Sequence, residues 1–188
     1  MGHAASGRKA STMTCCAGCT VPAPHSPFEL YGYCDASWAD NKQDRKSSIF
    51  HVIMINGGAF AWRATTSSVP ATSTAEAELY ALAAAVMEVI WARNLAFDLH
   101  FAQLAPTILY EDNHACIKMT HRELSRSRTK HIHNKYSFVH HHHAHGTFEA
   151  KPIPGLQQIA DIGATLRDAT RHEACTKVMR GEVGAASL

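Results

Sequence analysis

Apolar and aromatic residues in the first third of the chain form three short runs with the character of β-strands. Phe28–Trp38 is rich in aromatic residues, Ser48–Ile55 is β-branched and apolar, and Gly58–Ala64 follows closely. Asn56-Gly57 joins the last two runs, and this dipeptide is typical of a two-residue hairpin because both positions tolerate positive φ. The pattern predicts three antiparallel strands, with Asp35 on the first.

A long helix is predicted next, from Ser73 to about His100. Ser73-Thr-Ala-Glu76 matches a capping box, in which the serine accepts a hydrogen bond from the helix start and the glutamate reaches back. Glu76 and Glu78 are two residues apart and point to nearly opposite sides of the helix. The capping box accounts for Glu76 and leaves Glu78 available. The apolar stripe at helical spacing comprises Leu79, Leu82, Ala83, Val86, Ile90 and Phe97.

Strands and helices alternate in the rest of the chain. The expected elements are a strand at Thr107–Asp112, a short helix from Asp112-Asn113 through Met119, a helix within Ser127–His142, a strand at Thr147–Ile153, and a last helix containing Asp161. A run of strands followed by alternation predicts an α/β (mixed α+β) fold, with a five-stranded mixed sheet and helices on its faces.

Length and composition fit one globular domain. The chain has 188 residues, of which 46% are hydrophobic and 18% are charged, enough for a real core. We expect the domain to span residues 28–181, with a disordered lead-in at 1–27 and a disordered tail at 182–188. No apolar run approaches the roughly 20 residues of a membrane span, so no membrane partner is expected.

The six cysteines do not form the evenly spread pattern of a secreted disulfide scaffold. Cys15, Cys16 and Cys19 crowd the N-terminal segment, where half a zinc site is conceivable but no second Cys-x-x-Cys follows. The first 27 residues also lack the apolar core of a secretory signal. These features favour an intracellular location, in a cytoplasmic particle or the nucleus.

Four carboxylates stand in contexts that suit a metal site: Asp35, Glu78, Asp112 and Asp161. An acid in an apolar strand, as at Asp35, needs a buried partner or a metal. Taken singly, Asp112 suits a helix N-cap and Asp161 a solvated helical acid. Taken together, the four favour Mg²⁺, which takes oxygen ligands. Two such ions about 4 Å apart support in-line attack on a phosphodiester.

Net charge is only +2, yet basic residues are concentrated locally. The segment from Lys118 to Lys135 contains six Lys or Arg residues and only one acidic residue. Such a patch indicates a phosphate-binding surface, and a solvated basic loop is the alternative. The patch includes Arg126, Arg128, Lys130 and Lys135.

Six blocks, in order, resemble the ribonuclease H domain of copia-type retrotransposon polyproteins. The resemblance covers about Phe28 to Gly181. The blocks are Gly32-Tyr-Cys-Asp35-Ala-Ser-Trp38, Asn56-Gly-Gly-Ala-Phe-Ala-Trp62, Ser73-Thr-Ala-Glu-Ala-Glu78-Leu-Tyr, Leu109-Tyr-Glu-Asp112-Asn113, Ser127-Arg-Thr-Lys-His-Ile132 and Gln158-Ile-Ala-Asp161-Ile.

The resemblance implies a ribonuclease H-like fold and an endonuclease that cuts the RNA strand of RNA–DNA hybrids. It implies two Mg²⁺ ions, with Mn²⁺ as a possible substitute. It assigns Asp35, Glu78, Asp112 and Asp161 as catalytic metal ligands. The basic segment would contact the nucleic-acid backbone, and Asn113 is a candidate for contact with 2′-hydroxyls. In a full-length polyprotein, reverse transcriptase and integrase regions would be partners.

Two departures from that family pattern leave alternatives open. Gly163 replaces an expected large apolar residue, and a helical glycine is expected to loosen the helix carrying Asp161. An inactive nucleic-acid-binding remnant of the same domain is therefore the second interpretation. The tract His140–His145 is typical of an exposed, adventitious stretch; a metal site there is the alternative and would support a third interpretation, a metal-binding protein.

Overall fold

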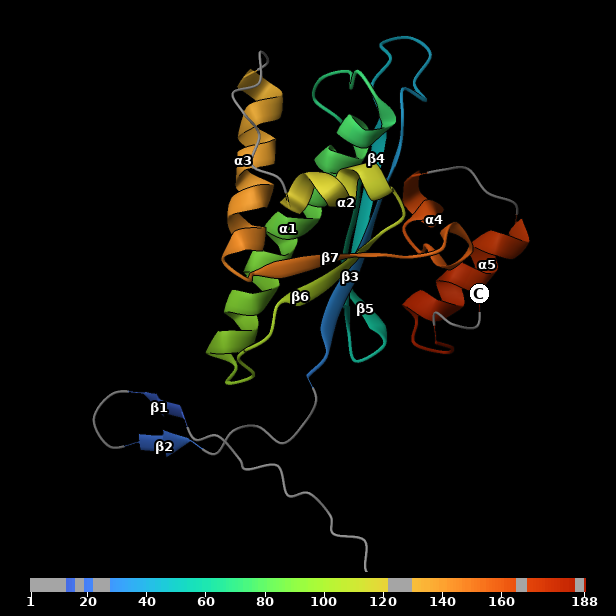
Figure 1. The fold of residues 1–188 in the computed structure, drawn as a ribbon. Helices are drawn as coiled ribbons and strands as arrows, with labels where there is room; N and C mark the ends of the chain where they lie inside the picture. The colour runs from blue at the N-terminus through green and yellow to red at the C-terminus, as the bar shows by residue number, and fades with distance from the viewer. Residues whose placement is uncertain (1–12, 16–18, 22–27, 122–129, 165–168, 185–187) are drawn as a thin grey trace, which may run out of the picture.

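The computed structural model describes residues 13–15, 19–21, 28–121, 130–164, 169–184 and 188 (Figure 1). The strands are β1 (Met13–Cys15), β2 (Cys19–Val21), β3 (Leu30–Ser37), β4 (Ser48–Ile55), β5 (Gly58–Thr66), β6 (Thr107–Glu111) and β7 (Phe148–Pro152). The helices are α1 (Thr74–Asp98), α2 (His114–His121), α3 (Lys130–Ala144), the 3₁₀ turn η1 (Gly155–Gln157), α4 (Asp161–Ala164) and α5 (Ala169–Met179).

The main sheet has five strands in the order β5-β4-β3-β6-β7. β3, β4 and β5 are antiparallel neighbours, while β6 pairs in parallel with β3 and β7 in parallel with β6. The predicted five-stranded mixed sheet is therefore confirmed. Because β3 and β6 run in parallel, their carboxyl ends lie at the same edge, which carries Asp35 and the residue after β6, Asp112.

Local signals at two junctions act as the sequence predicts. Asn56 and Gly57 have φ of 49° and 89°, so the hairpin between β4 and β5 uses the expected left-handed pair. At the start of α1, Ser73 accepts a hydrogen bond from the Glu76 amide at 3.2 Å. The Glu76 side chain reaches back as expected, but its Oε2 accepts a hydrogen bond from the amide of Thr72, at 2.7 Å. Glu76 is thereby committed to the cap.

Helices cover both faces of the sheet. Figure 1 shows α1, α2 and α3 on one side and α4 and α5 on the other. α1 is long and apolar enough to cross a membrane by length and composition alone, a test that core helices of soluble proteins also pass. Its residues Leu79, Leu82 and Val86 are buried in the larger core cluster. The smaller cluster joins Phe50 and Val52 of β4 to the C-terminal helices.

Two segments differ from the expected elements. The last helix is divided into η1, α4 and α5, because the turn is tied into the sheet: the Gln158 side chain is buried and donates from Nε2 to the carbonyl of Cys34 at 2.9 Å. Within the first 27 residues, for which the sequence predicts disorder, β1 pairs with β2 in a short antiparallel hairpin. The predicted domain limits stay predictions.

The structure gives Gly163 a packing role instead of the loosening expected from its helix propensity. A Cβ atom built at this position would overlap the ring of Phe50, a buried residue of β4. The missing side chain is what lets α4 lie close against β4. Gly163 therefore allows the close packing of the helix that begins with Asp161.

Candidate metal centre

Three of the four predicted acids converge at one edge of the sheet. Asp35 from β3, Glu78 from α1 and Asp112 after β6 each offer one carboxylate oxygen, and these oxygens all lie within 4.8 Å of one another. We call these three residues the carboxylate group. The parallel pairing of β3 with β6 aligns the two aspartates, and α1 packs across β3 with Glu78 in its first turns. The arrangement offers oxygen ligands to a hard divalent cation.

Burial makes the carboxylate group electrostatically unfavourable without a counter-charge. Asp35 and Glu78 are 5% and 6% exposed, and Asp112 is partly exposed. Burial, followed by the charges of Glu111, Asp35 and Asp112, raises the pKa of Glu78 well above its ordinary value. Glu78 Oε2 is buried and has no hydrogen-bond partner among the described residues. These features fit a bound cation, which would supply both the missing partner and the missing charge.

A fifth carboxylate, Glu111, lies beside the group and was not among the residues chosen from the sequence. It is fully buried at the end of β6. Its oxygens accept hydrogen bonds from the Asn113 amide at 3.0 Å and from Cys34 Sγ at 3.4 Å. Burial raises its pKa above the ordinary value. The sequence of β6 shows no polar–apolar alternation, so the burial of Glu111 becomes clear only in the structure, where Thr107, Leu109 and Glu111 point inward.

Asp161 is buried at the start of α4 but does not belong to the carboxylate group. Its Oδ2 lies 4.0 Å from Arg171 Nη2 of α5. The same Arg171 nitrogen donates to the carbonyls of Gly155 at 3.2 Å and Gln158 at 3.3 Å. Since Gln158 is bonded to Cys34, next to Asp35, these contacts fasten the Asp161 segment to β3. The structure therefore ties the segment that carries Asp161 to β3, next to Asp35, but Asp161 is not a member of the carboxylate group.

The predicted nucleic-acid contacts are only partly described. Asn113 caps α2, its Oδ1 accepting from the amides of Ala115 and Cys116 at 2.9 Å and 3.1 Å, so only its NH₂ end remains as a donor to a ligand. The ammonium of Lys135 lies 4.4 Å from the centre of the Tyr80 ring. Arg126 and Arg128 lie outside the described residues, as does the side chain of Lys130. The nucleic-acid surface stays a prediction.

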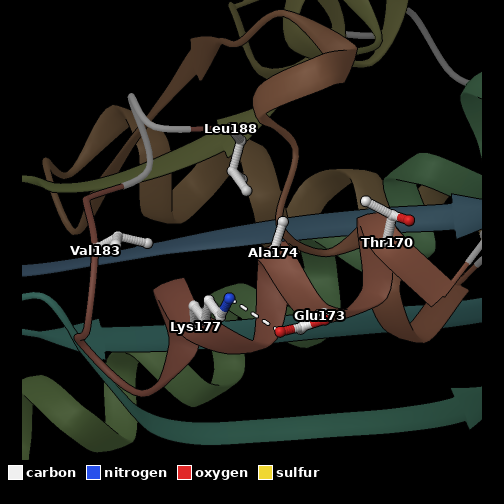
Figure 2. Close-up of a pocket in the computed structure, with 6 residues that line it drawn as sticks. All are labelled: Thr170, Glu173, Ala174, Lys177, Val183 and Leu188. Atoms are coloured by element: carbon white, nitrogen blue, oxygen red, sulfur yellow. Dashed lines mark ion pairs between the residues drawn. The ribbon is translucent and has the colours of Figure 1, made fainter.

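A separate hollow lies between α5 and the end of the chain, and Figure 2 shows its lining. Its one charged pair is Lys177 with Glu173, 2.9 Å apart. No member of the carboxylate group lines it. The full lining is Thr170, Glu173, Ala174, Lys177, Val183 and Leu188.

Several sequence relatives of the chain are polyproteins of plant transposons. It is 32% identical over 110 residues to the retrovirus-related Pol polyprotein from transposon TNT 1-94 of Nicotiana tabacum, covering 58% of this chain and 8% of the relative. It is 26% identical over 134 residues to the corresponding polyprotein from transposon RE1 of Arabidopsis thaliana, covering 71% and 9%. The chain thus spans less than a tenth of these relatives. No family model matches it.

Solved structures with the same fold are ribonuclease H domains. The N-terminal RNase H domain of a Mycobacterium tuberculosis protein superposes with a TM-score of 0.52 at 12% identity, over 80% of this chain and 97% of that one. LC11-RNase H1, solved in complex with an RNA/DNA hybrid, has a TM-score of 0.50 at 12% identity, over 69% and 88%. At these identities the likeness establishes the fold. The chain therefore has a ribonuclease H-like fold and is similar in sequence to retrotransposon Pol polyproteins.

Proposed function

We propose that this domain is a Mg²⁺-dependent endonuclease that cuts the RNA strand of RNA–DNA hybrids. The observation that carries the proposal is the carboxylate group, three acids from distant parts of the chain brought within 4.8 Å of one another. Most buried carboxylates are paired or bind a metal. The ribonuclease H fold and the transposon relatives supply the class of reaction.

The chain's own residues would hold and orient the ions. Asp35 and Glu78 are buried on regular elements, β3 and α1, so their carboxylates are fixed before substrate arrives. Asp112 is partly exposed and would face the scissile phosphate. Two bound Mg²⁺ ions, or Mn²⁺ in their place, would supply an activated water and charge stabilisation at the phosphate. Asp161, at the start of α4, is proposed as an outer ligand of the same site.

The proposed substrate follows from the same class. A structural neighbour was solved with an RNA/DNA hybrid, and recognition of RNA depends on 2′-hydroxyl contacts across a shallow minor groove. Here the Asn113 amide and the basic segment with Arg126, Arg128, Lys130 and Lys135 are proposed to contact the hybrid. In a longer polyprotein, the reverse transcriptase and integrase regions would be partners inside the cell.

The first test is cleavage of a hybrid whose RNA strand is labelled, with and without Mg²⁺, by the parent chain and by Asp112→Asn. Asp44→Asn is the matched control, because Asp44 is exposed, pairs with Lys46 and is not a member of the group. We expect Mg²⁺-dependent cutting of the RNA strand by the parent and by Asp44→Asn only. Single-stranded RNA of the same sequence should resist cleavage.

One observation favours the alternative of an inactive nucleic-acid-binding remnant: Asp161 pairs with Arg171 and stays outside the group. A folded parent chain that binds the hybrid in a gel-shift assay without cutting it would support this alternative and contradict the nuclease proposal. Equal cutting by the parent and by Asp112→Asn would instead remove the carboxylate group from the mechanism.

A further inference from the structure

The C-terminal turn of α3 carries a run of histidines whose rings have different surroundings. His140 stacks on Tyr136, with ring centres 6.1 Å apart. His142 Nδ1 lies 3.3 Å from Thr147 Oγ1. His143 packs edge-on against two rings, His121 at 4.5 Å and Phe148 at 5.7 Å. These three histidines are at most partly exposed and are engaged with the body of the domain.

His141 and His145 form a different arrangement. Both are exposed, they are four residues apart, and their ring centres are separated by 4.1 Å. The His145 amide donates to the His141 carbonyl at 3.0 Å, so the helical bond pattern extends through the pair and fixes its spacing. Two histidines at i and i+4 on one helical face are a recurrent way to bind a transition metal.

A hydrogen bond defines the protonation of one ring. His145 Nδ1 lies 2.7 Å from the His141 carbonyl oxygen. Because a carbonyl can only accept, Nδ1 must carry the proton, and Nε2 of the neutral ring then presents its lone pair. Histidine ligands are held in this way, with the second ring nitrogen donating to a carbonyl or carboxylate. The ring is therefore prepared for coordination through Nε2.

The surroundings also favour a cation. The pair lies at the C-terminal end of α3, where the aligned peptide dipoles of the helix give a partial negative charge. Neutral imidazoles are metal ligands, whereas imidazolium is not.

We propose that His141 and His145 together bind one borderline transition-metal ion of the Zn²⁺, Ni²⁺ or Cu²⁺ class. Imidazole nitrogen selects these ions, whereas the oxygens of the carboxylate group select Mg²⁺. With two protein ligands, the remaining coordination positions would be filled by water, so the site is open to solvent. A bound ion would bridge the last turn of α3 just before Gly146 and β7, and would stabilise that junction by mass action.

The site is tested by titrating Zn²⁺ into the chain purified without immobilised-metal chromatography. Cys15, Cys16 and Cys19 are replaced by serine in every protein, because thiolates would compete for Zn²⁺. We expect His141→Ala and His145→Ala each to weaken the calorimetric affinity by about tenfold or more. His140→Ala is the matched control from the same tract and should keep the parent affinity.

Nitrogen-15 spectra of the histidine side chains give a readout that does not depend on affinity alone. The metal-free parent should show His145 with its proton on Nδ1, and Zn²⁺ should shift the Nε2 resonance of His145 together with one ring nitrogen of His141. Equal losses in His140→Ala and His141→Ala would overturn the proposal, because they would indicate diffuse binding by the whole tract. Unchanged His141 and His145 spectra at saturating Zn²⁺ would overturn it as well. Neither result depends on nuclease activity.

Discussion

The two faces of the sheet hold their acids by different means. On the α1 face, Glu78 is placed by the register of a 25-residue helix with a side-chain cap, beside aspartates aligned by strand pairing. On the other face, Asp161 begins a helix of four residues. That helix is kept in place by single contacts, including the Arg171 bonds and the close packing at Gly163. Regular secondary structure thus positions Asp35 and Glu78, with Asp112 directly after β6, whereas tertiary contacts position Asp161.

The difference matters for chemistry because a metal site tolerates little error in ligand position. Acids on long, buried elements move only when the core moves. An acid on a four-residue helix can shift when one supporting contact is lost. The acids on the α1 face should therefore determine whether an ion binds. Asp161, on the α4 face, should affect only how tightly the bound ion is held.

The largest expected effect compares one acid from each face. Asp35→Asn should reduce hybrid cleavage by about 10³-fold, the scale seen when a preorganised electrostatic group is removed from an active site. Asp161→Asn should cost only about tenfold, because Asp161 lies outside the group. The measurement is kcat/KM for RNA-strand cleavage at saturating Mg²⁺. Equal losses would show that Asp161 joins the group when the ions bind, and would erase the distinction between the faces.

The same contrast explains what the sequence could predict. Periodicity and local turn chemistry predict the strands around Asp35 and Asp112, the hairpin at Asn56 and the capped helix with Glu78. The structure confirms these elements. Such signals are local, and the elements they specify are long enough to be recognised. The expectation that the acids meet came from the metal-site argument and the family resemblance, and it covered four acids, of which three lie together.

The remaining features depend on contacts between distant residues. Gly163 has an unfavourable helix propensity, yet it is needed because the Phe50 ring, far away in sequence, occupies the space of its Cβ. The division of the last helix depends on Gln158 reaching Cys34. The Arg171 contact with Asp161 is equally non-local. Glu111 belongs with these features, because the sequence of β6 does not alternate between polar and apolar residues, and its burial follows from the position of β6 between β3 and β7.

A second prediction concerns the stability of the α1 face as a function of pH, without metal. The pKa of Glu78 in the folded chain is raised above its ordinary value of 4.5, mainly by burial. Above pH 4.5, Glu78 of the unfolded chain loses its carboxyl proton while Glu78 of the folded chain keeps it. The free energy of unfolding should therefore fall as pH rises. One such group contributes a slope of at most about 1.4 kcal/mol per pH unit. Urea unfolding in EDTA between pH 5.5 and 8.5 measures it.

Glu78→Gln should flatten this pH dependence, because the glutamine does not titrate, and it should raise stability most at the alkaline end. Glu111 will leave a residual slope, since burial also raises its pKa. Glu173→Gln on α5 is the control from the other face; the pKa of Glu173 is lowered by its bond to Lys177, so the substitution should leave the slope between pH 5.5 and 8.5 unchanged. A parent chain whose stability rises through this range would contradict the electrostatic account of the group.

The smallest effect tests the packing that holds the α4 face. Gly163→Ala should lower the free energy of unfolding by about 1–3 kcal/mol, the usual cost of overpacking, although alanine has the better helix propensity. Gly184→Ala is the matched control, because nothing lies near the Cβ it would add. Shortening the opposing ring in Phe50→Leu/Gly163→Ala should recover part of the loss relative to Phe50→Leu alone. A stabilising Gly163→Ala would show that propensity outweighs packing here, and the α4 face would then be as firmly specified by local sequence as the α1 face.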